Sequence, residues 1–258
     1  METKLILLDL DYTLLHSDRT ISADTVETLA KCQAQGIKVG FSTSRGSTNI
    51  QQYVDLIHPD VIICNAGSCV YYQGTLIHTQ SFTLEQTRTL FDAAYRYGGK
   101  DLEITCDTLD ELYWNRKENK SEQYMPDATY SDFKDFKIPV FKVCIQTTEE
   151  DVASKIAMAL GPDVCDYVLF SDIPWFKLAP KASTKENAIL FLSQYLDIPT
   201  EKMIAFGDDF SDMGMLRLCG TGVAMGNAIP QVKEIADALT LTNDEDGVAV
   251  YINQNVLA

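Results

Sequence analysis

The first apolar segment of the chain stops at two carboxylates. Residues 4–8 are Lys-Leu-Ile-Leu-Leu, and Asp9 and Asp11 follow two positions apart. A short apolar run bounded by polar residues predicts a strand that is buried on both faces, as in a parallel sheet. Asp9 then stands at the carboxyl end of that strand, which is where open α/β sheets bind their ligands.

Strand-like runs and helix-like segments alternate over the first eighty residues. In chain order we predict a helix capped by Ser22 that closes at Gly36, a strand at 37–41, the start of a second helix at 42–46, a strand at 61–64, and a hairpin with strands at 69–72 and 76–78. The order βαβαβ is typical of a doubly wound parallel sheet.

The pattern changes between residues 83 and 180. There we predict a helix at 84–97, strands at 102–106 and 111–115, a stretch without clear periodicity at 116–137, a strand at 140–146, a helix at 149–160, and strands at 167–170 and 175–178. Closely spaced strands without crossover helices are antiparallel. We therefore predict an α+β domain at 83–180, inserted between the two parts of a core domain, 1–82 and 181–258.

The doubly wound pattern then resumes. The predicted elements are a helix at 183–196, a strand at 203–206, a strand and turn at 222–228, a helix with Pro230 in its first turn, and a short helix that opens at Asp246. The predicted fold class is α/β, with a doubly wound, Rossmann-like parallel core and one inserted α+β domain.

Three predicted strands end in side chains that suit phosphate chemistry. Asp9 and Asp11 follow the first strand, Thr43 follows the second, and Asp208 and Asp209 follow the strand at 203–206. Parallel strands point the same way, so these ends converge on one crevice. A carboxylate such as Asp9 can attack phosphorus and form a covalent intermediate. Asp11 would then serve as the acid and base.

The same convergence predicts a metal ion. Asp9, Asp208 and the backbone carbonyl of Asp11 offer hard oxygens, and water and a phosphate oxygen would complete a Mg²⁺ octahedron. Lys185, at the start of a predicted helix, offers a fixed positive charge. The hydroxyls of 42–46, at another predicted helix start, suit a phosphate oxygen.

Each of these features also has a simpler explanation. The acidic turn could form an Asx-type bond to Thr13, and Ser44 or Ser47 could merely cap a helix. A lone lysine such as Lys185 is commonly a solvated surface residue. The aromatic and cationic group at 114–117 could contact a substrate, but we slightly favour a strand edge with a solvated end.

Composition and charge narrow the class of protein. The chain has 258 residues, 46% apolar and 22% charged, which is typical of a globular protein. Its formal net charge of −16 repels nucleic acid and anionic membranes. We therefore expect neither as a partner. A phosphate substrate is repelled too, so its site must supply local positive charge.

Cysteine usage and the amino-terminal segment bear on location. The seven cysteines are odd in number and show no Cys-x-x-Cys spacing, which favours buried, reduced thiols. We see no apolar segment of signal-peptide or membrane-span length. We expect a soluble cytoplasmic protein, a monomer or a weak homodimer.

Four motifs in order resemble those of the haloacid dehalogenase superfamily, specifically its Cof-type (class IIB), sugar-phosphatase-like branch. The motifs are Asp9-Leu10-Asp11-Tyr12-Thr13, Thr43 within 42–45, Lys185, and Gly207-Asp208-Asp209-Phe210-Ser211-Asp212. The resemblance covers nearly the whole chain. It implies a Mg²⁺-dependent phosphatase that hydrolyses small phosphate monoesters, such as sugar phosphates, through an aspartyl phosphate. Residues 83–180 would be a mobile cap that selects the leaving group.

The resemblance also implies a role for each site residue. Asp9 would be the nucleophile, and Asp11 would protonate the leaving alcohol and later activate water. The implied phosphate ligands are Thr43, Ser44, Lys185 and Ser211; the implied metal ligands are Asp9, Asp11 and Asp208; Asp209 and Asp212 would support the waters around the metal.

Three positions depart from the family pattern, and two other functions stay open. Tyr12 and Ser44 stand where the family usually has Gly, and Ser211 where Asn is common. These departures leave substrate range and rate open. One alternative is a phosphomutase on the same core. The other is a phospho-aspartate signalling domain, against which stand the Asp-x-Asp-x-Thr spacing and the long insertion.

Overall fold

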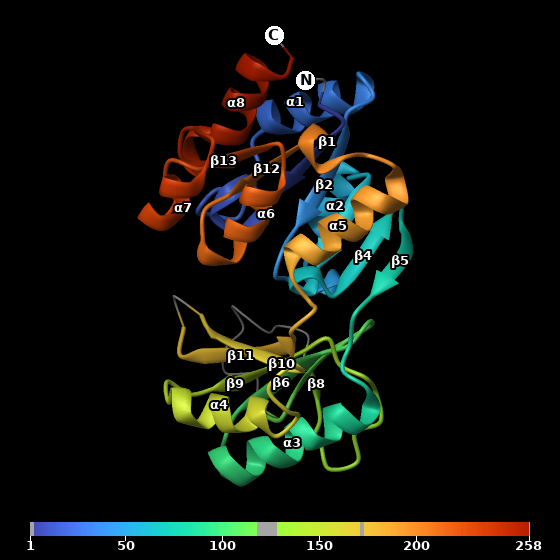
Figure 1. Cartoon of the computed structure of the whole chain (residues 1–258), viewed down its shortest axis with the longest axis vertical. Helices are drawn as coiled ribbons and strands as arrows, with labels where there is room; N and C mark the ends of the chain where they lie inside the picture. The colour runs from blue at the N-terminus through green and yellow to red at the C-terminus, as the bar shows by residue number, and fades with distance from the viewer. Residues whose placement is uncertain (1–2, 118–127, 171–172, 258) are drawn as a thin grey trace. The chain divides into compact units, whose positions relative to one another are not determined.

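The chain folds as two compact units. The computed structural model describes residues 3–117, 128–170 and 173–257 (Figure 1). The larger unit comprises Met1–Arg45, Ile50–Thr79 and Thr184–Ala258, and the inserted unit comprises Gly46–Asn49 and Gln80–Ser183. The sequence predicted the insertion at 83–180. Part of the aperiodic stretch 116–137, namely 118–127, lies outside the described residues, as do residues 171 and 172 between two predicted strands.

The larger unit is built on a mixed sheet whose centre is parallel. In the described residues its eight strands have the order β14-β13-β12-β1-β2-β3-β4-β5. Their bounds are β1 Leu5–Leu8, β2 Lys38–Ser42, β3 Val61–Cys64, β4 Cys69–Tyr72, β5 Thr75–Thr79, β12 Met203–Gly207, β13 Thr221–Ala224 and β14 Ala238–Leu239. The pairs from β14 to β3 are parallel, and the β4–β5 hairpin is added antiparallel at one edge. The predicted α/β fold class is confirmed.

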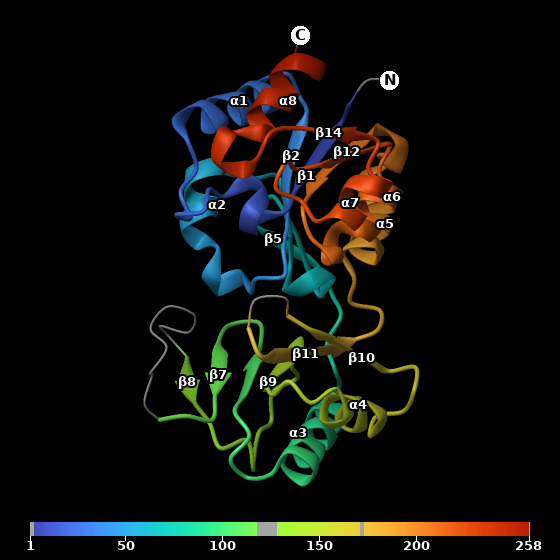
Figure 2. The same ribbon diagram turned by 90° about the vertical axis from the view of Figure 1, so that its left-hand side faces the viewer.

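Helices cover both faces of this sheet. Their bounds are α1 Ala23–Ala34, α2 Gln51–Ile57, α5 Lys185–Leu196, α6 Met213–Leu218, α7 Pro230–Ile235 and α8 Gly247–Asn255. Figure 2 shows α1, α2 and α8 on one side of the strands and α5, α6 and α7 on the other. Because β1 has a strand on each edge and helices on each face, all four of its residues are buried, as its apolar run predicts.

The register of the central strands brings their carboxyl ends together. Leu8, the last residue of β1, lies beside Phe41 of β2 and Phe206 of β12. The chain therefore leaves these three strands at the same edge of the sheet. At that edge, Asp9 follows β1, residues 43–45 follow β2 and Asp208 follows β12.

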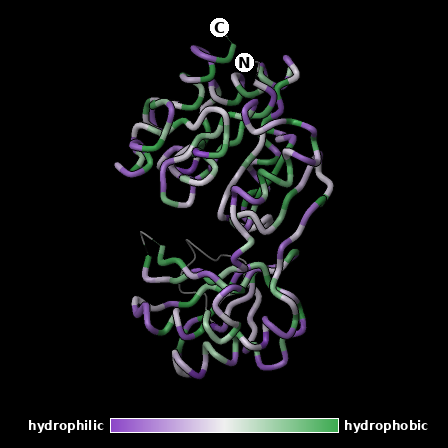
Figure 3. The backbone as a smooth tube through the Cα atoms, in the orientation of Figure 1, coloured by the Kyte–Doolittle hydropathy of each residue, from purple (hydrophilic) through white to green (hydrophobic). Residues whose placement is uncertain are grey.

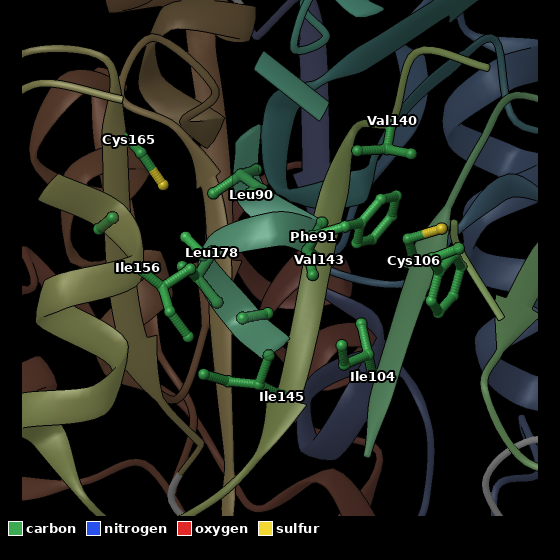
Figure 4. Packing of buried hydrophobic residues seen from close by; sticks show 14 of the residues in the cluster. Leu90, Phe91, Ile104, Cys106, Val140, Val143, Ile145, Ile156, Cys165 and Leu178 are labelled. Atoms are coloured by element: carbon green, nitrogen blue, oxygen red, sulfur yellow. The ribbon is translucent and has the colours of Figure 1, made fainter. Parts of the chain in front are cut away.

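The inserted unit is a sheet with two helices packed on it. The strand order among the described residues is β10-β11-β9-β6-β7-β8. The elements are α3 Leu84–Gly98, β6 Ile104–Asp107, β7 Leu112–Trp114, β8 Thr129–Tyr130, β9 Lys142–Gln146, α4 Glu150–Met158, β10 Cys165–Leu169 and β11 Trp175–Pro180. All strand pairs are antiparallel except β7 with β8. Residues of α3, α4 and the sheet form one apolar core (Figure 4).

Both units contain hydrophobic stretches (Figure 3). The seven cysteines lie in the described ranges, and every one is a buried thiol without a disulfide. Burial raises the pKa of Cys165 and Cys219 to about 12. No helix in the described part of the chain is both long and apolar enough to cross a bilayer.

One predicted helix start is met only by a short turn. The hydroxyl-rich segment 42–46 was expected to open a helix; a 3-10 turn follows it at Ser47–Asn49, and α2 begins only at Gln51, where the cap position, Ile50, has no side-chain bond. Instead the Thr43 hydroxyl accepts from the backbone N–H of Arg45, and the Arg45 carbonyl accepts from that of Asn65. The second of these bonds, together with the bond from the Ala66 N–H to the Thr43 carbonyl, ties the segment to the loop after β3. Neither Ser44 nor Ser47 caps α2.

The group at 114–117 belongs to a strand end in the inserted unit. Trp114 is buried at the end of β7. The Asn115 side chain bonds to the backbone of Leu102 and Ile104, and Arg116 pairs with Glu103. These contacts agree with the strand-edge interpretation.

Candidate active site

A buried lysine lies among the acidic residues at the carboxyl ends of the central strands. Asp9 directly follows β1 and is only 7% exposed, while Lys185, the first residue of α5, is 2% exposed. Lys185 Nζ donates to Asp9 Oδ1 over 2.6 Å and to Asp212 Oδ1 over 2.7 Å. The interpretation of Lys185 as a solvated surface residue is therefore wrong. The side chain lies in the larger unit as the cation between two carboxylates.

Local backbone geometry brings α5 to this position. Thr184 caps the helix by accepting from the backbone N–H of Asn187. Gly67, in the turn after β3, lies so close that a Cβ there would clash with the Thr184 carbonyl. Gly67 also has φ +102°, a region that favours glycine. The start of α5, and with it Lys185, therefore fits closely against the loop after a neighbouring strand.

Asp212 organises the loop that follows β12. Its Oδ2 accepts from the backbone N–H groups of Asp208 and Asp209 over 3.0 and 3.2 Å, while its Oδ1 accepts from Lys185. A Cβ on Gly207 would clash with the Asp212 side chain. The carboxylate that anchors this loop therefore also anchors the lysine.

Three carboxylates form a candidate metal site. One oxygen each of Asp9, Asp208 and Asp212 lies within 4.8 Å of the others. Asp212 is already engaged by Lys185 and two N–H groups, so Asp9 and Asp208 are better placed to give oxygens to a cation. The grouping includes Asp212, for which the sequence implied only support of metal waters, and omits the Asp11 side chain.

The charges at this site are unbalanced. Three carboxylates face one ammonium group. Burial, opposed by Lys185 and reinforced by Asp212 and Asp208, raises the pKa of Asp9 well above its usual range. Burial, together with the charge of Asp212, raises the pKa of Asp208 to about 7. A divalent cation would relieve this excess of negative charge, and the hard carboxylate oxygens fit Mg²⁺.

Thr13 is a site residue that sequence reasoning did not assign. It is buried, and its hydroxyl donates to Asp208 Oδ1 over 2.9 Å. The Thr13 hydroxyl therefore reaches an acid outside this turn, whereas the Asx-type bond considered for the turn would use the backbone N–H of Thr13. Because 195 positions separate the partners, the only signal in the sequence was the presence of Thr13 in the first motif.

The Asp11 carboxylate is held apart from the other acids by Arg45. Arg45 Nε and Nη2 donate to its two oxygens over 2.8 and 2.6 Å, a bidentate pair. Burial lowers the Arg45 pKa, but Asp11 more than offsets this, and the pKa is raised. The guanidinium also lies 5.6 Å from the centre of the Tyr53 ring. The sequence motifs assigned no role to Arg45.

The remaining predicted residues differ in their surroundings. Thr43 is buried next to Arg45, and Ser44 is partly exposed. Asp209 Oδ1 accepts from the backbone N–H of Phe210. Ser211 is exposed, and its hydroxyl makes no hydrogen bond to another described residue. The structure therefore brings Asp9, Asp208, Asp212 and Lys185 together, links Thr43 to Asp11 through Arg45, and leaves Ser211 apart.

Known proteins resemble this chain over nearly its whole length. The family model described as haloacid dehalogenase-like hydrolase matches residues 6–252. The 5-amino-6-(5-phospho-D-ribitylamino)uracil phosphatase YitU of Bacillus subtilis is 32% identical over 272 residues, 98% of each chain. A haloacid dehalogenase-like hydrolase from Bacteroides thetaiotaomicron has a similar structure, with TM-score 0.84, 27% identity, and coverage of 98% and 99% of the two chains. The structure of the subclass IIB sugar phosphatase BT4131 shares the fold, with TM-score 0.82, 22% identity and 98% of each chain covered.

Proposed function

Because this chain belongs to the haloacid dehalogenase-like hydrolase family, it is a phosphoric monoester hydrolase, and we propose that it is a Mg²⁺-dependent phosphatase of small phosphorylated metabolites. The observation that carries the proposal is the buried group of Asp9, Asp208 and Asp212 around Lys185. This arrangement offers a nucleophile, cation ligands and a fixed positive charge at one sheet edge.

In the proposed reaction Asp9 is the nucleophile. Its carboxylate oxygen forms a bond to phosphorus while the bond from phosphorus to the leaving oxygen breaks. Asp11 gives a proton to that oxygen, which leaves as an alcohol. Asp11 then takes a proton from a water molecule, whose oxygen attacks the aspartyl phosphate. Inorganic phosphate leaves, and Asp9 returns to its starting form.

The other residues hold charge and orientation. Lys185, paired with Asp9 over 2.6 Å, lies where it can neutralise a phosphoryl oxygen. The hydroxyls of Thr43 and Ser44 are proposed to donate to the same group. Ser211 is proposed only as a weaker contact, since it is exposed. Arg45 orients Asp11 through its two hydrogen bonds.

A magnesium ion would be held by Asp9, Asp208 and the backbone carbonyl of Asp11. Thr13 orients Asp208 through its hydroxyl, and Asp212 keeps the loop of Asp208 and Asp209 in place. When bound, the ion supplies neutralisation of the phosphate charge during transfer. Asp209 would support waters around it.

The substrate class is proposed to be phosphorylated sugars and related metabolites, with residues 83–180 as the cap that selects among them. The name of YitU gives 5-amino-6-(5-phospho-D-ribitylamino)uracil as that protein's substrate, so this compound belongs in the panel to be tested. Sugar phosphates form the rest of the panel.

The experiment is phosphate release from p-nitrophenyl phosphate and from the panel, with Mg²⁺ and with EDTA. Asp9→Asn is expected to lower kcat by about 10⁴-fold or more, as removal of a covalent nucleophile does. Asp107→Asn changes a buried acid of the inserted unit and is the matched control. Full activity of Asp9→Asn after rigorous purification would remove the proposed nucleophile. Formation of a hexose 6-phosphate from a hexose 1-phosphate, without free phosphate, would indicate a phosphomutase.

A further inference from the structure

Tyr12 has a backbone conformation that a side chain disfavours. It follows Asp11 directly and has φ +57°, in the left-handed region. Glycine adopts this region without steric cost, whereas a residue with a Cβ does not. Such outliers cluster at functional sites, where the surrounding structure holds them in place. The geometry of the turn therefore does not explain why a tyrosine stands at this position.

The Tyr12 ring does not contribute to the buried core. Its side chain is 55% exposed, and it makes no ring stacking with another aromatic residue in the described ranges. The backbone bears the constraint instead, since the Tyr12 carbonyl accepts from Asn227 Nδ2 over 2.7 Å. The turn is thus fixed by its main chain, and the ring is left exposed on the residue that directly follows Asp11.

A second exposed aromatic residue lies on the neighbouring loop. Phe210 comes two positions after Asp208, and it is the one phenylalanine in the described part of the chain with an exposed side chain, at 58%. The two loops are linked directly. Thr13 donates to Asp208, and the Asp208 carbonyl accepts from the backbone N–H of Ile229, close to the Asn227 that holds Tyr12.

We propose that Tyr12 and Phe210 are specificity-determining residues, which bind a planar ring in the leaving group of the phosphate ester. An exposed aromatic ring next to a charged site gains binding free energy when an apolar or π-bearing surface of a ligand packs against it. The preferred substrates are then phosphate monoesters whose alcohol carries a planar ring. This inference rests on the phosphatase activity proposed above.

The test compares two esters of similar size that differ in the nature of the ring. Benzyl phosphate and cyclohexylmethyl phosphate are both esters of primary alcohols, but one ring is planar and aromatic and the other is puckered and saturated. The quantity measured is the ratio of kcat/KM for benzyl phosphate to that for cyclohexylmethyl phosphate. We expect Tyr12→Gly to lower this ratio about tenfold, which corresponds to about 1.4 kcal/mol, mainly through KM. Phe210→Ala should lower it at least threefold.

Two variants serve as controls. Tyr12→Phe keeps the ring and should keep the ratio within twofold. Tyr195→Ala removes an exposed tyrosine of α5 that touches no site residue, and it should also leave the ratio unchanged. Inhibition by benzylphosphonate, which cannot be hydrolysed, gives a reading of binding without turnover. Its inhibition constant should rise in Tyr12→Gly by the same factor.

Stability separates this role from a structural one. Because φ +57° suits glycine, Tyr12→Gly should keep or raise the melting temperature. A lower melting temperature with an equal loss on both esters would mean that Tyr12 is structural and would overturn the inference. So would an unchanged ratio in both Tyr12→Gly and Phe210→Ala. If the wild-type protein hydrolyses neither ester nor any compound of the panel, the proposed function itself fails.

Discussion

Each unit of the molecule contains a lysine beside a buried carboxylate, fully buried in the larger unit and partly buried in the inserted one, and the two groups differ in charge balance. In the larger unit Lys185 lies 2.6 Å from Asp9 and 2.7 Å from Asp212. In the inserted unit Lys142 lies 3.5 Å from Asp107. Asp208 adds a third carboxylate to the first group. The contact in the inserted unit joins one acid to one base, whereas the group in the larger unit places three acids around one base.

This difference teaches how a structural ion pair differs from a site. Burial raises the pKa of Asp107, and Lys142 opposes that shift. At Asp9 the opposition of Lys185 is partly cancelled by two neighbouring acids, and the pKa stays well above its usual range. Burying a group of unbalanced charges lowers the stability of the fold unless a cation or a substrate neutralises the excess charge. The excess of acids therefore indicates function more strongly than burial does.

The largest expected difference concerns the two lysines. Lys185→Met should lower phosphatase activity about 10³-fold, because a fixed positive charge at the phosphate is lost. It should also lower the free energy of unfolding by about 3–5 kcal/mol, since buried carboxylates lose their partner. Lys142→Met is the matched change and should lower activity less than tenfold. The measurements are steady-state kinetics and urea unfolding. Equal loss of activity in the two variants would contradict the distinction between a functional lysine and a structural one.

The next effect is a dependence of stability on pH in the metal-free protein. Asp208 has a pKa of about 7 when folded, against about 4 in an unfolded chain. The contribution of Asp208 to the free energy of unfolding is fully present below pH 4 and is lost as the pH rises through 7. A shift of about three pKa units corresponds to at most about 4 kcal/mol. Stability in EDTA should therefore be higher at pH 5 than at pH 8.

Asp208→Asn isolates this contribution from the other acids of the chain. In EDTA the variant should lose less stability than the wild type between pH 5 and pH 8, as measured by urea unfolding. Mg²⁺ should restore stability to the wild type at pH 8 and have a smaller effect on the variant. A wild type that depends on pH no more than Asp208→Asn would contradict the proposed charge excess.

A smaller effect is expected for the arginine beside Asp11. Arg45→Gln removes the bidentate contact and should lower kcat by about 10–100-fold, with KM within threefold, because Asp11 loses its orientation. Arg116→Gln breaks a comparable pair with Glu103 in the inserted unit and should leave kcat within twofold. A change in KM alone for Arg45→Gln would point to substrate binding instead.

The smallest effects distinguish two hydroxyls of the larger unit. Thr13→Val keeps the shape but removes the hydrogen bond to Asp208, and it should cost about tenfold in kcat/KM, or about 1.4 kcal/mol. Ser211→Ala removes an exposed hydroxyl and should cost less than threefold. Both are measured at saturating Mg²⁺. A larger loss in Ser211→Ala than in Thr13→Val would restore Ser211 as a main phosphate ligand.

Much of the architecture was predictable because it depends on local patterns. The strand at 61–64 and the helix start at Leu84 agree with the structure to the residue, and Pro230 lies in the first turn of a helix, as predicted. Buried apolar runs and capping residues carry their information within a few positions. The segment at 42–46 leads only into a 3-10 turn at Ser47–Asn49, because the carbonyls of Thr43 and Arg45 accept from the loop after β3 and not from a following helix.

The arrangement of charges was harder to predict from sequence. The order of the motifs indicated which acids converge, but it did not indicate that Lys185 is buried between Asp9 and Asp212. Nor did it indicate that Arg45 holds Asp11. These contacts join residues between 27 and 176 positions apart. Such pairings depend on the exit direction of each strand and on close approaches such as that of Gly67, which no periodicity encodes.

The buried cysteines make it possible to follow the unfolding of this protein by thiol labelling. Each thiol is covered, and burial raises the pKa of several of them, so alkylating reagents find almost no reactive thiolate in the native state. Cys106, Cys144 and Cys165 belong to the inserted unit, and Cys32, Cys64, Cys69 and Cys219 to the larger one. The order in which peptides acquire label during gradual denaturation therefore reports which unit opens first.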